Sequence, residues 1–399
     1  MADRTIKPDS GNDLVLQNNG GGTKIEIPNS GNIAVTGTFE NIVTVNSLSN
    51  RNVLINGAMQ CWQRSSSSKL CYDGNNEGYS NVDRFSMQFG SGAGQSGNGR
   101  ITTSQETSVL PDIAGGDKFN KALKLVCTAT ESPGSAKEIA ISHRVEGQDM
   151  QRFGWGQTNP KSAILSFYFK TSLVGVYSIS LTHTGTGPRR RMISFNVADT
   201  NWNRYQIPIS ADTVKVPDDN TLGLNIMWFL MNVPSYQYTG GTDSGWGTTI
   251  YLTDDDQVNF LSSTSNSLYI TGVQLELGSV ATPFEHRSFG DELRKCQRYC
   301  VVYGDGTNGA AEWVVNGAAP NTTNIYANYL LPVPPRSTPT VSCSGLMRIS
   351  DNYVLDHTAN PAGIGTQPNT QSSYTNGGRL FLTGFSGLTI GRNYGSGRS

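Results

Sequence analysis

Strand-length apolar runs follow one another through the middle of the chain, and this succession restricts the folds open to it. Examples are ALKLVCTAT at 122–130, AILSFYFKT at 163–171 and SLYITGVQLEL at 267–277. Turn-forming residues separate most runs, and no helical periodicity lies between them. The 45 glycines and the charged fraction of 15% also indicate a turn-rich β protein. We therefore predict an all-β fold in which residues 49–288 form an antiparallel β-sandwich that is jelly-roll-like.

A strand and a proline break mark the end of this sandwich. Val273, Leu275 and Leu277 alternate with Gln274 and Glu276, which is the two-residue period of a half-buried strand. We expect the three apolar side chains to face the core and the two polar ones to point outward. The proline of the following Ala-Thr-Pro segment lacks an amide donor and disfavours helix at the residue before it, so the strand stops there.

A connecting helix is expected over residues 289–300. Ser288 can cap its first turn, and the acidic residues that follow lie near the positive end of the helix dipole. Three- and four-residue spacings predict one buried stripe, formed by Leu293, Cys296 and Cys300. The basic side chains of the segment are expected to be more exposed: Arg294, Lys295 and Arg298.

The two ends of the chain are predicted to form further β structure. Residues 1–48 hold three short apolar pairs separated by Gly- and Asn-rich turns: Leu14 with Leu16, Ile25 with Ile27, and Ile33 with Val35. Each pair is too small to bury itself, so we interpret the segment as oligomeric β rungs completed by other copies of the chain. A flexible tail is the alternative. Runs such as NIYANYLLPV and LFLTGF predict a small C-terminal β domain over residues 301–399.

Charge and cysteine content narrow the partners. Lys and Arg number 30 and Asp and Glu number 31, so the net charge is -1, which disfavours nucleic acid as a partner. The chain starts without a secretory apolar core, and no run approaches about 18 apolar residues, so we expect cytoplasmic synthesis and no membrane insertion. The 6 cysteines are interpreted mainly as buried free thiols. A disulfide between Cys61 and Cys71, or zinc ligation by Cys296 and Cys300, is a weaker alternative.

No recognised catalytic motif is present in the sequence. It has no Gly-x-Ser-x-Gly elbow, P-loop, HExxH or Rossmann glycine pattern. Glu276 and Glu285 could form the paired acids of a glycosidase, but their places in a strand and a corner favour structural roles. Three adjacent carboxylates, Asp254, Asp255 and Asp256, offer oxygen ligands for calcium, yet such loops are more often simply solvated. We therefore expect no enzymatic activity, no cofactor and no metal.

Aromatic side chains in loops are the preferred binding candidates, because rings stack on sugar faces while polar neighbours fix orientation. The glycan-binding candidates are Tyr236, Tyr238, Trp246 and Asp243 in one Gly-rich segment, and Phe153 and Trp155 in a second loop. The competing interpretation is that these rings pin long loops onto the sandwich. The basic triplet Arg189 to Arg191 could meet an anionic polysaccharide or a neighbouring subunit, and a solvated hairpin end explains it equally well.

Segments at both ends of the sandwich region resemble those of a known protein family. VQLELGSVATPFEHRSFGDELRKCQRYC at 273–300 is similar to the closing signature of bacteriophage tail-fibre and other virion-fibre proteins. NVLINGAMQCWQRS at 52–65 and YSNVDRFSM at 79–87 resemble the opening of the same domain. The resemblance implies a homotrimer located in the virion. The short β rungs of residues 1–48, which lie outside the resemblance, would suit an anchor to other phage virion proteins.

The function that this resemblance implies is attachment to the host cell by non-covalent binding of a surface glycan. Two other classes of function stay open at this point. One is a structural role, as a tail adaptor, a capsid decoration or a head fibre. The other is enzymatic, as a polysaccharide depolymerase that would cleave the glycan it binds.

Overall fold

The computed structural model describes residues 14–17, 24–27, 34–36, 50–90, 100–111, 118–134, 138–185, 187–303, 316–340, 347–350, 356–359, 364–367, 377–390 and 392–396. The chain divides into two compact units, Met1–Asn50 and Arg51–Ser399. Among the described residues no helix is both long enough and apolar enough to cross a membrane.

The first unit is a three-stranded antiparallel sheet of short strands. Its strands are β1 (Leu14–Gln17), β2 (Lys24–Ile27) and β3 (Ala34–Thr36), in the order β1-β2-β3. Leu14 is opposite Ile27 and Leu16 is opposite Ile25, so two of the apolar pairs face each other across the ladder. The predicted short strands are confirmed, although Ile33 lies outside the described residues. Their completion by other copies of the chain stays a prediction.

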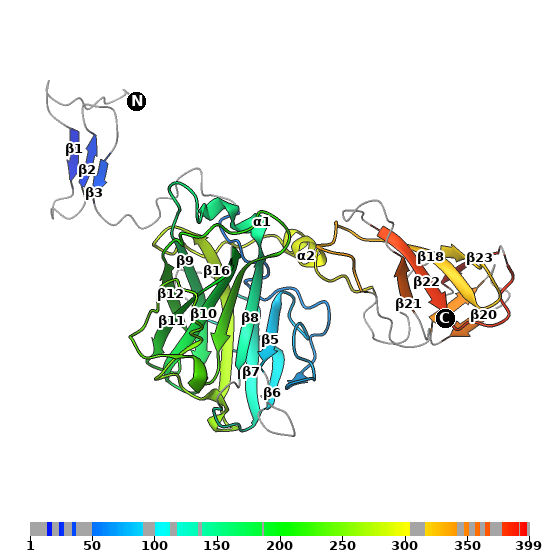
Figure 1. Ribbon diagram of the computed structural model, residues 1–399, viewed down its shortest axis with the longest axis horizontal. Helices are drawn as coiled ribbons and strands as arrows, with labels where there is room; N and C mark the ends of the chain where they lie inside the picture. Colours follow the sequence, from blue (N-terminus) through cyan, green and yellow to red (C-terminus); the bar gives the residue numbers. More distant parts are fainter. Residues whose placement is uncertain are drawn as a thin grey trace, which may run out of the picture. The chain divides into compact units, whose positions relative to one another are not determined.

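Two antiparallel sheets make up the sandwich of the second unit (Figure 1). The five-stranded sheet contains, in order, β11 (Gly187–Val197), β10 (Gly175–Gly185), β13 (Leu222–Phe229), β8 (Ile139–Glu146) and β5 (Phe85–Phe89). The six-stranded sheet contains β12 (Asn203–Ile209), β9 (Ala163–Thr171), β16 (Ser267–Leu277), β7 (Ala122–Ala129), β6 (Arg100–Glu106) and β4 (Lys69–Cys71).

The order of these strands is that of a jelly roll. From β7 to β10 the chain changes sheet at every strand, and β12, β13 and β16 again alternate between the sheets. The resulting neighbours are β12-β9-β16-β7 in one sheet and β11-β10-β13-β8 in the other, which is the arrangement of two interleaved Greek keys. The prediction of an all-β, antiparallel, jelly-roll-like sandwich is therefore confirmed.

The core between the sheets is built around large aromatic side chains. The Phe167 ring meets the Trp228 ring edge to face at 5.7 Å and the Phe195 ring at 5.3 Å. Pairs of this geometry stabilise a core by about 0.5–1.5 kcal/mol each beyond their buried area. Val273 and Leu275 are fully buried in the same core, as their alternation predicts.

The outward face of β16 differs from the sequence prediction. Gln274 and Glu276 are only 0% and 2% exposed, whereas Leu277, predicted to be inward, is 41% exposed. The reason is that the chain turns back over this face after the strand: Glu276 Oε1 accepts from the Thr282 amide at 2.8 Å, and Gln274 Oε1 accepts from the Glu285 amide at 2.8 Å. Both polar side chains are thus buried among hydrogen bonds rather than solvated.

The connecting helix α2 (Phe289–Gln297) begins where the sequence predicts. Ser288 is its N-cap, and its hydroxyl accepts from the Asp291 amide. Cys296 is buried beside Cys61, and Leu293 packs against the same cluster, as expected of the stripe. Cys300 departs from the prediction, because the helix ends at Gln297 and this thiol is only half-buried. Of the three basic residues predicted to be exposed, only Arg294 is; Lys295 and Arg298 are half-buried. The Arg298 guanidinium forms two 2.8 Å hydrogen bonds to the Glu146 carboxylate instead of pointing into solvent.

A long segment between β13 and β16 lies against the five-stranded sheet. It contains η4 (Pro234–Tyr236), β14 (Gln237–Tyr238), β15 (Thr253–Asp254) and η5 (Phe260–Ser262). Two short helical elements, α1 (Gly147–Met150) and η3 (Gln151–Phe153), follow β8.

Beyond α2 the chain forms a seven-stranded antiparallel sheet. Its strands are β17 (Asn316–Ala318), β18 (Asn324–Leu330), β19 (Met347–Ser350), β20 (Asp356–Ala359), β21 (Ile364–Gln367), β22 (Gly377–Thr383) and β23 (Asn393–Ser396).

Candidate binding surface on the six-stranded sheet

The second predicted aromatic loop does not present its rings to solvent. Phe153 is 0% exposed and Trp155 is 2% exposed, and both belong to the core between the sheets. The Trp155 indole donates to the Lys161 carbonyl at 2.9 Å, which closes the loop over its own ring. Neither ring can stack on a sugar, so the prediction for this pair is wrong. The competing interpretation, that the rings pin a long loop, describes them.

The first predicted segment adds a strip of backbone to the edge of β11. The Ser194 amide donates to the Thr242 carbonyl at 2.8 Å, and Arg190 exchanges backbone hydrogen bonds of 2.8 and 2.9 Å with Gly247. Asp243 lies between these contacts and holds the Arg191 guanidinium. Burial alone would raise the pKa of Asp243, but the hydrogen bonds from Arg191 and from a backbone amide lower it overall. Asp243 is thus committed to fixing the loop.

Trp246 has a similar anchoring role. Its ring is half-buried and meets the Trp155 ring edge to face at 5.2 Å, and its indole donates to the Ser210 carbonyl at 2.8 Å. It also meets the ring of the buried His183 at 5.1 Å. One edge of Trp246 remains open to solvent, but most of its polar and aromatic contacts are internal.

The basic triplet on β11 is neutralised from within rather than solvated. Arg189 forms two 2.9 Å hydrogen bonds to Asp212, which also holds His183 at 2.7 Å. Arg191 is paired with Asp243, as described above. Two of the three cations therefore have carboxylate partners inside the protein, which leaves little charge for an anionic polysaccharide at this hairpin.

Tyr236 and Tyr238 are half-buried, as Trp246 is. The Tyr238 ring packs edge to face on the Tyr251 ring at 5.0 Å. It also covers Gly240, where a Cβ would come within 2.6 Å of the ring. Tyr236 packs against a small buried cluster that includes Ala140 of β8 and Phe229 of β13, so this ring also anchors the loop to the five-stranded sheet.

The acidic loop does bring its carboxylates together. One oxygen from each of Asp254, Asp255 and Asp256 lies within 4.8 Å of the others. Asp254 is already bound, because its carboxylate accepts from the Ser194 hydroxyl at 2.7 Å and from the Asp256 amide at 3.0 Å. The other two residues are exposed. Proximity of exposed acids alone does not define a metal site, and we assign none.

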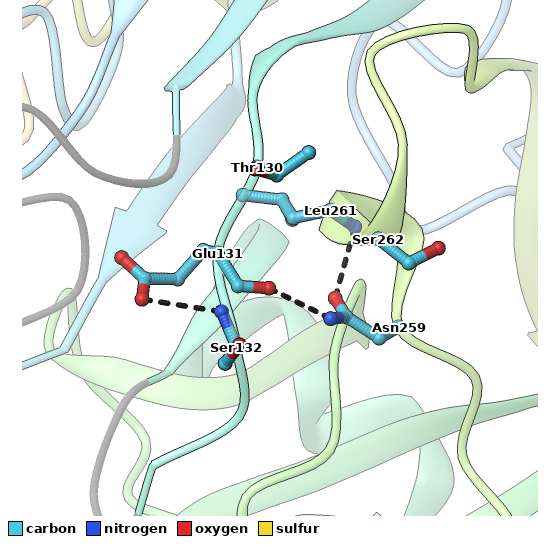
Figure 2. A pocket seen from close by; sticks show the side chains of 6 residues that line it. All are labelled: Thr130, Glu131, Ser132, Asn259, Leu261 and Ser262. Atoms are coloured by element: carbon cyan, nitrogen blue, oxygen red, sulfur yellow. Dashed lines mark hydrogen bonds between the residues drawn. The ribbon is translucent and has the colours of Figure 1, made fainter.

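A hollow in the surface lies beside η5 (Figure 2). Its volume is about 430 Å³, and it is lined by Thr130, Glu131, Ser132, Asn259, Leu261 and Ser262. The Asn259 amide group spans the hollow, since it donates to the Glu131 carbonyl at 2.7 Å and accepts from the Leu261 amide at 2.9 Å. Figure 2 shows this side chain engaged on both sides. The hollow is polar and open, without an aromatic ring in its lining.

The opening and closing motifs meet in space and form a buried polar joint. The Glu285 carboxylate accepts from the Arg51 amide at 3.1 Å and from the Asn52 amide at 2.8 Å. Asn52 in turn donates to the Val273 carbonyl at 3.0 Å and accepts from the Leu275 amide at 3.0 Å. Burial would raise the pKa of Glu285, but the Asn52 amide and the charge of the neighbouring arginine lower it overall.

The rest of the two motifs completes this joint. Arg287 lies 3.2 Å from Glu285 and 3.4 Å from Glu292, and it donates to the Asn52 carbonyl. Gly57 faces the Val273 carbonyl so closely that a Cβ would lie 2.0 Å from its oxygen. Because more than 200 residues separate the partners in sequence, the joint fixes the two ends of the sandwich to each other.

A row of side chains on the outer face of the six-stranded sheet is the surface best suited to a ligand. Lys170, Tyr269, Lys124 and Ser104 are successive partners across β9, β16, β7 and β6, and we name them the lysine–tyrosine row. Directly paired residues project from the same face of a sheet. Their strand neighbours, such as Leu125 and Ile270, are fully buried, so the row points away from the core.

The geometry of the row places two cations beside one ring. The Lys124 ammonium lies 5.5 Å from the centroid of the Tyr269 ring, and the Lys170 ammonium lies 6.0 Å from it. Trp202, which precedes β12, extends the row, since its ring centroid is 6.1 Å from that of Tyr269. Cation–π contacts at exposed sites stabilise such an arrangement by about 0.5–1 kcal/mol each. All five side chains are half-buried, so they are held by neighbours yet reachable from solvent.

Sequence reasoning missed this surface, although the signal existed. Lys124 and Tyr269 occupy outward positions of runs predicted to be strands, and Lys170 is the penultimate residue of another such run. An outward aromatic residue between apolar positions indicates a ring on a sheet face. What could not be read is that the three positions share one row, because that depends on the register of three strands that are distant in sequence.

Comparisons with known proteins give only faint similarities. No protein-family model matches the chain, and no curated protein matches it. A solved structure of a candidate sugar-binding protein from Bacteroides thetaiotaomicron is 12% identical, with 57% of this chain and 100% of that chain covered and a TM-score of 0.28.

Two further solved structures are similarly distant. A family 11 carbohydrate-binding module from Clostridium thermocellum, in complex with a β-1,3-1,4-mixed-linked tetrasaccharide, is 11% identical, with 56% of this chain and 99% of that chain covered and a TM-score of 0.25. An exo-β-agarase is 11% identical, with 59% of this chain and 25% of that chain covered and a TM-score of 0.27. Similarities this weak carry no argument about the function of this chain.

Proposed function

We propose that this chain is a glycan-binding protein that acts by non-covalent recognition, and that it does so as a fibre of a bacteriophage particle attaching to its host. The observation that carries the binding proposal is the lysine–tyrosine row with Trp202: aromatic rings and long donor side chains gathered on one face of a rigid sheet. Rings offer apolar area to sugar faces, and donors on strands hold fixed positions.

Other observations support binding rather than cleavage. The acids that could have formed a glycosidase pair are both engaged inside the protein: Glu276 accepts from the Thr282 amide, and Glu285 accepts from the Arg51 and Asn52 amides in the joint. A retaining or inverting glycosidase needs two carboxyl groups that reach the scissile bond from a shared groove. Neither of these carboxylates is open to a sugar.

The assignment to a phage fibre rests on the motifs and on their contact with each other. The opening segments contact the closing one at two places: Asn52 donates to the Val273 carbonyl, and the Arg84 guanidinium lies 3.4 Å from the centroid of the Tyr299 ring. Several copies of the chain in one particle would compensate for a shallow binding site. Linked weak contacts raise the avidity of the particle well above the affinity of a single surface. The homotrimer and the attachment of the N-terminal sheet to other virion proteins are parts of this proposal.

The purified full-length chain should be tested against a panel of bacterial capsular polysaccharides and lipopolysaccharides, with newly formed reducing ends measured in the same samples. Saturable binding without reducing ends is the expected result. Release of reducing ends would establish a depolymerase instead. Absence of binding to every member of the panel would favour a structural adaptor or decoration protein. Sedimentation in the same buffer would show whether the chain is a trimer.

A further inference from the structure

The lysine–tyrosine row is rich in hydrogen-bond donors and poor in acceptors. Lys170 belongs to no ion pair with a described residue, and the Tyr269 hydroxyl forms no hydrogen bond to one. The ammonium group of lysine has only donors, whereas a neutral sugar hydroxyl both donates and accepts. The surface is therefore better matched by a ligand that supplies acceptors.

The charges of the row also favour a ligand that supplies acceptors. Lys124 lies 3.5 Å from the Glu106 carboxylate, and its side chain is 31% exposed. That carboxylate is mainly engaged elsewhere, because its other oxygen accepts from the Ser108 hydroxyl and from the amides of Thr107, Ser108 and Val109 at 2.7–3.0 Å. One lysine is thus only partly compensated and the other is uncompensated. The surface is locally positive on a chain whose net charge is -1.

Glu106 stays ionised in ordinary buffers, so the net charge of the row does not change with its protonation. Burial would raise its pKa, but the hydrogen bonds from Ser108 and Val109 and the charge of Lys124 outweigh it and lower the pKa to about 2. The carboxylate therefore stays ionised throughout the range in which glycans are bound. The charge available to a ligand comes from Lys170 and from the unpaired part of Lys124.

We infer that the glycan bound at the lysine–tyrosine row is acidic, with carboxylate or sulfate groups that lie between Lys170 and Lys124 and reach the Tyr269 hydroxyl. This inference rests on the proposed glycan-binding function and names the ligand class for the same surface. Charge-assisted hydrogen bonds from ammonium to an anionic oxygen are about twice as strong as neutral ones, so two such contacts suffice to select an acidic chain over a neutral one.

The test uses the full-length chain and three probes: oligogalacturonate, a sulfated galactan and neutral dextran, each titrated at low and high salt. We expect both acidic probes to bind more tightly than dextran, with an affinity that falls as salt screens the ammonium groups. Lys170→Gln should weaken acidic binding about fivefold, the effect of one partly exposed charge contact. Lys170→Arg should retain binding, and Tyr269→Phe should weaken it by about two- to threefold.

Lys161→Gln is the matched control, because it removes the same charge from an exposed residue two positions before β9, whereas Lys170 lies near the other end of that strand. It should leave acidic binding unchanged. If Lys161→Gln and Lys170→Gln weaken binding equally, attraction by overall charge explains the result and the row is not the site. If dextran binds as tightly as the acidic probes at both salt levels, the acidic ligand is refuted while the proposed function stands. If none of the bacterial glycans or probes binds, both fail.

Discussion

His143 is a buried, neutral base whose removal should change how stability depends on pH. Its ring is 1% exposed and lies edge to face against Phe85 at 4.8 Å, and Nε2 lies 3.0 Å from the Ile55 carbonyl. Burial, followed by the charge of Arg84, lowers the pKa of His143 from 6.5 to about 3. In the folded chain this imidazole therefore stays neutral at pH values where the unfolded chain takes up a proton.

The sign and size of the effect follow from that difference. Below pH 6.5 the unfolded state binds one more proton at this position than the folded state, so the free energy of unfolding falls as the pH falls towards 3. At pH 5 the unfolded pKa lies about 1.5 units above the solution pH. At about 1.36 kcal/mol per unit, His143 should therefore cost about 2 kcal/mol of stability between pH 7.5 and pH 5.

The assay is urea unfolding of wild type and His143→Gln at pH 7.5, 6.5, 5.5 and 5, followed by tryptophan fluorescence. Glutamine keeps a donor for the Ile55 carbonyl but does not titrate. The variant should be less stable at pH 7.5, because a ring contact is lost, yet its loss between pH 7.5 and 5 should be smaller than that of wild type by about 2 kcal/mol. Parallel pH dependences in the two proteins would refute a neutral buried His143.

Three further outcomes are expected. Gly57→Ala should destabilise the sandwich by more than about 2 kcal/mol, since its Cβ would lie 2.0 Å from the Val273 oxygen; a chain that melts at the wild-type temperature would contradict the joint. Asp243→Asn should weaken the pairing of residues 242–247 with β11 by about 0.5–1 kcal/mol, a modest value because the carboxylate is 39% exposed. Faster hydrogen exchange at the Ser244 and Gly247 amides, with β13 unchanged, is the readout. The pKa of Cys296 is raised by the adjacent Cys61 thiol and by burial. A thiol reagent at pH 8 should therefore label Cys296 only after unfolding, and rapid labelling of the native chain would show that the cluster opens.

The cysteines that lie next to each other in the structure are not those that the sequence spacing suggests. The spacing suggests Cys61 and Cys71 as the pair that could approach each other, but the structure places the Cys61 thiol against Cys296 and the Cys71 thiol 3.5 Å from the Thr103 hydroxyl. Cys296 lies in helix α2, and the joint holds this helix next to the opening motif that contains Cys61. Sequence distance is a poor guide here, because the jelly roll brings its first and last segments together.

For the candidate site, too, local sequence located the aromatic loops but did not show which of their rings are buried. The aromatic loops were found from composition, but only the structure separates the buried Trp155 from the half-buried Trp246 and Tyr238. A ring in a Gly-rich loop has no local pattern that states which way it faces. That direction depends on whether the loop closes on itself, as at Trp155, or adds to a strand edge, as at Asp243.

The sequence by itself determined the strands, their inward faces and the start of α2 at Ser288, because period-two alternation and N-capping act over a few residues. Only the tertiary structure decided that Gln274 and Glu276 are buried, that Arg298 is held by Glu146, and that Lys170, Tyr269 and Lys124 form one row. Each of these depends on segments that are far apart in the chain. Their register is set by the packing of the whole sandwich, and no short stretch of sequence contains that information.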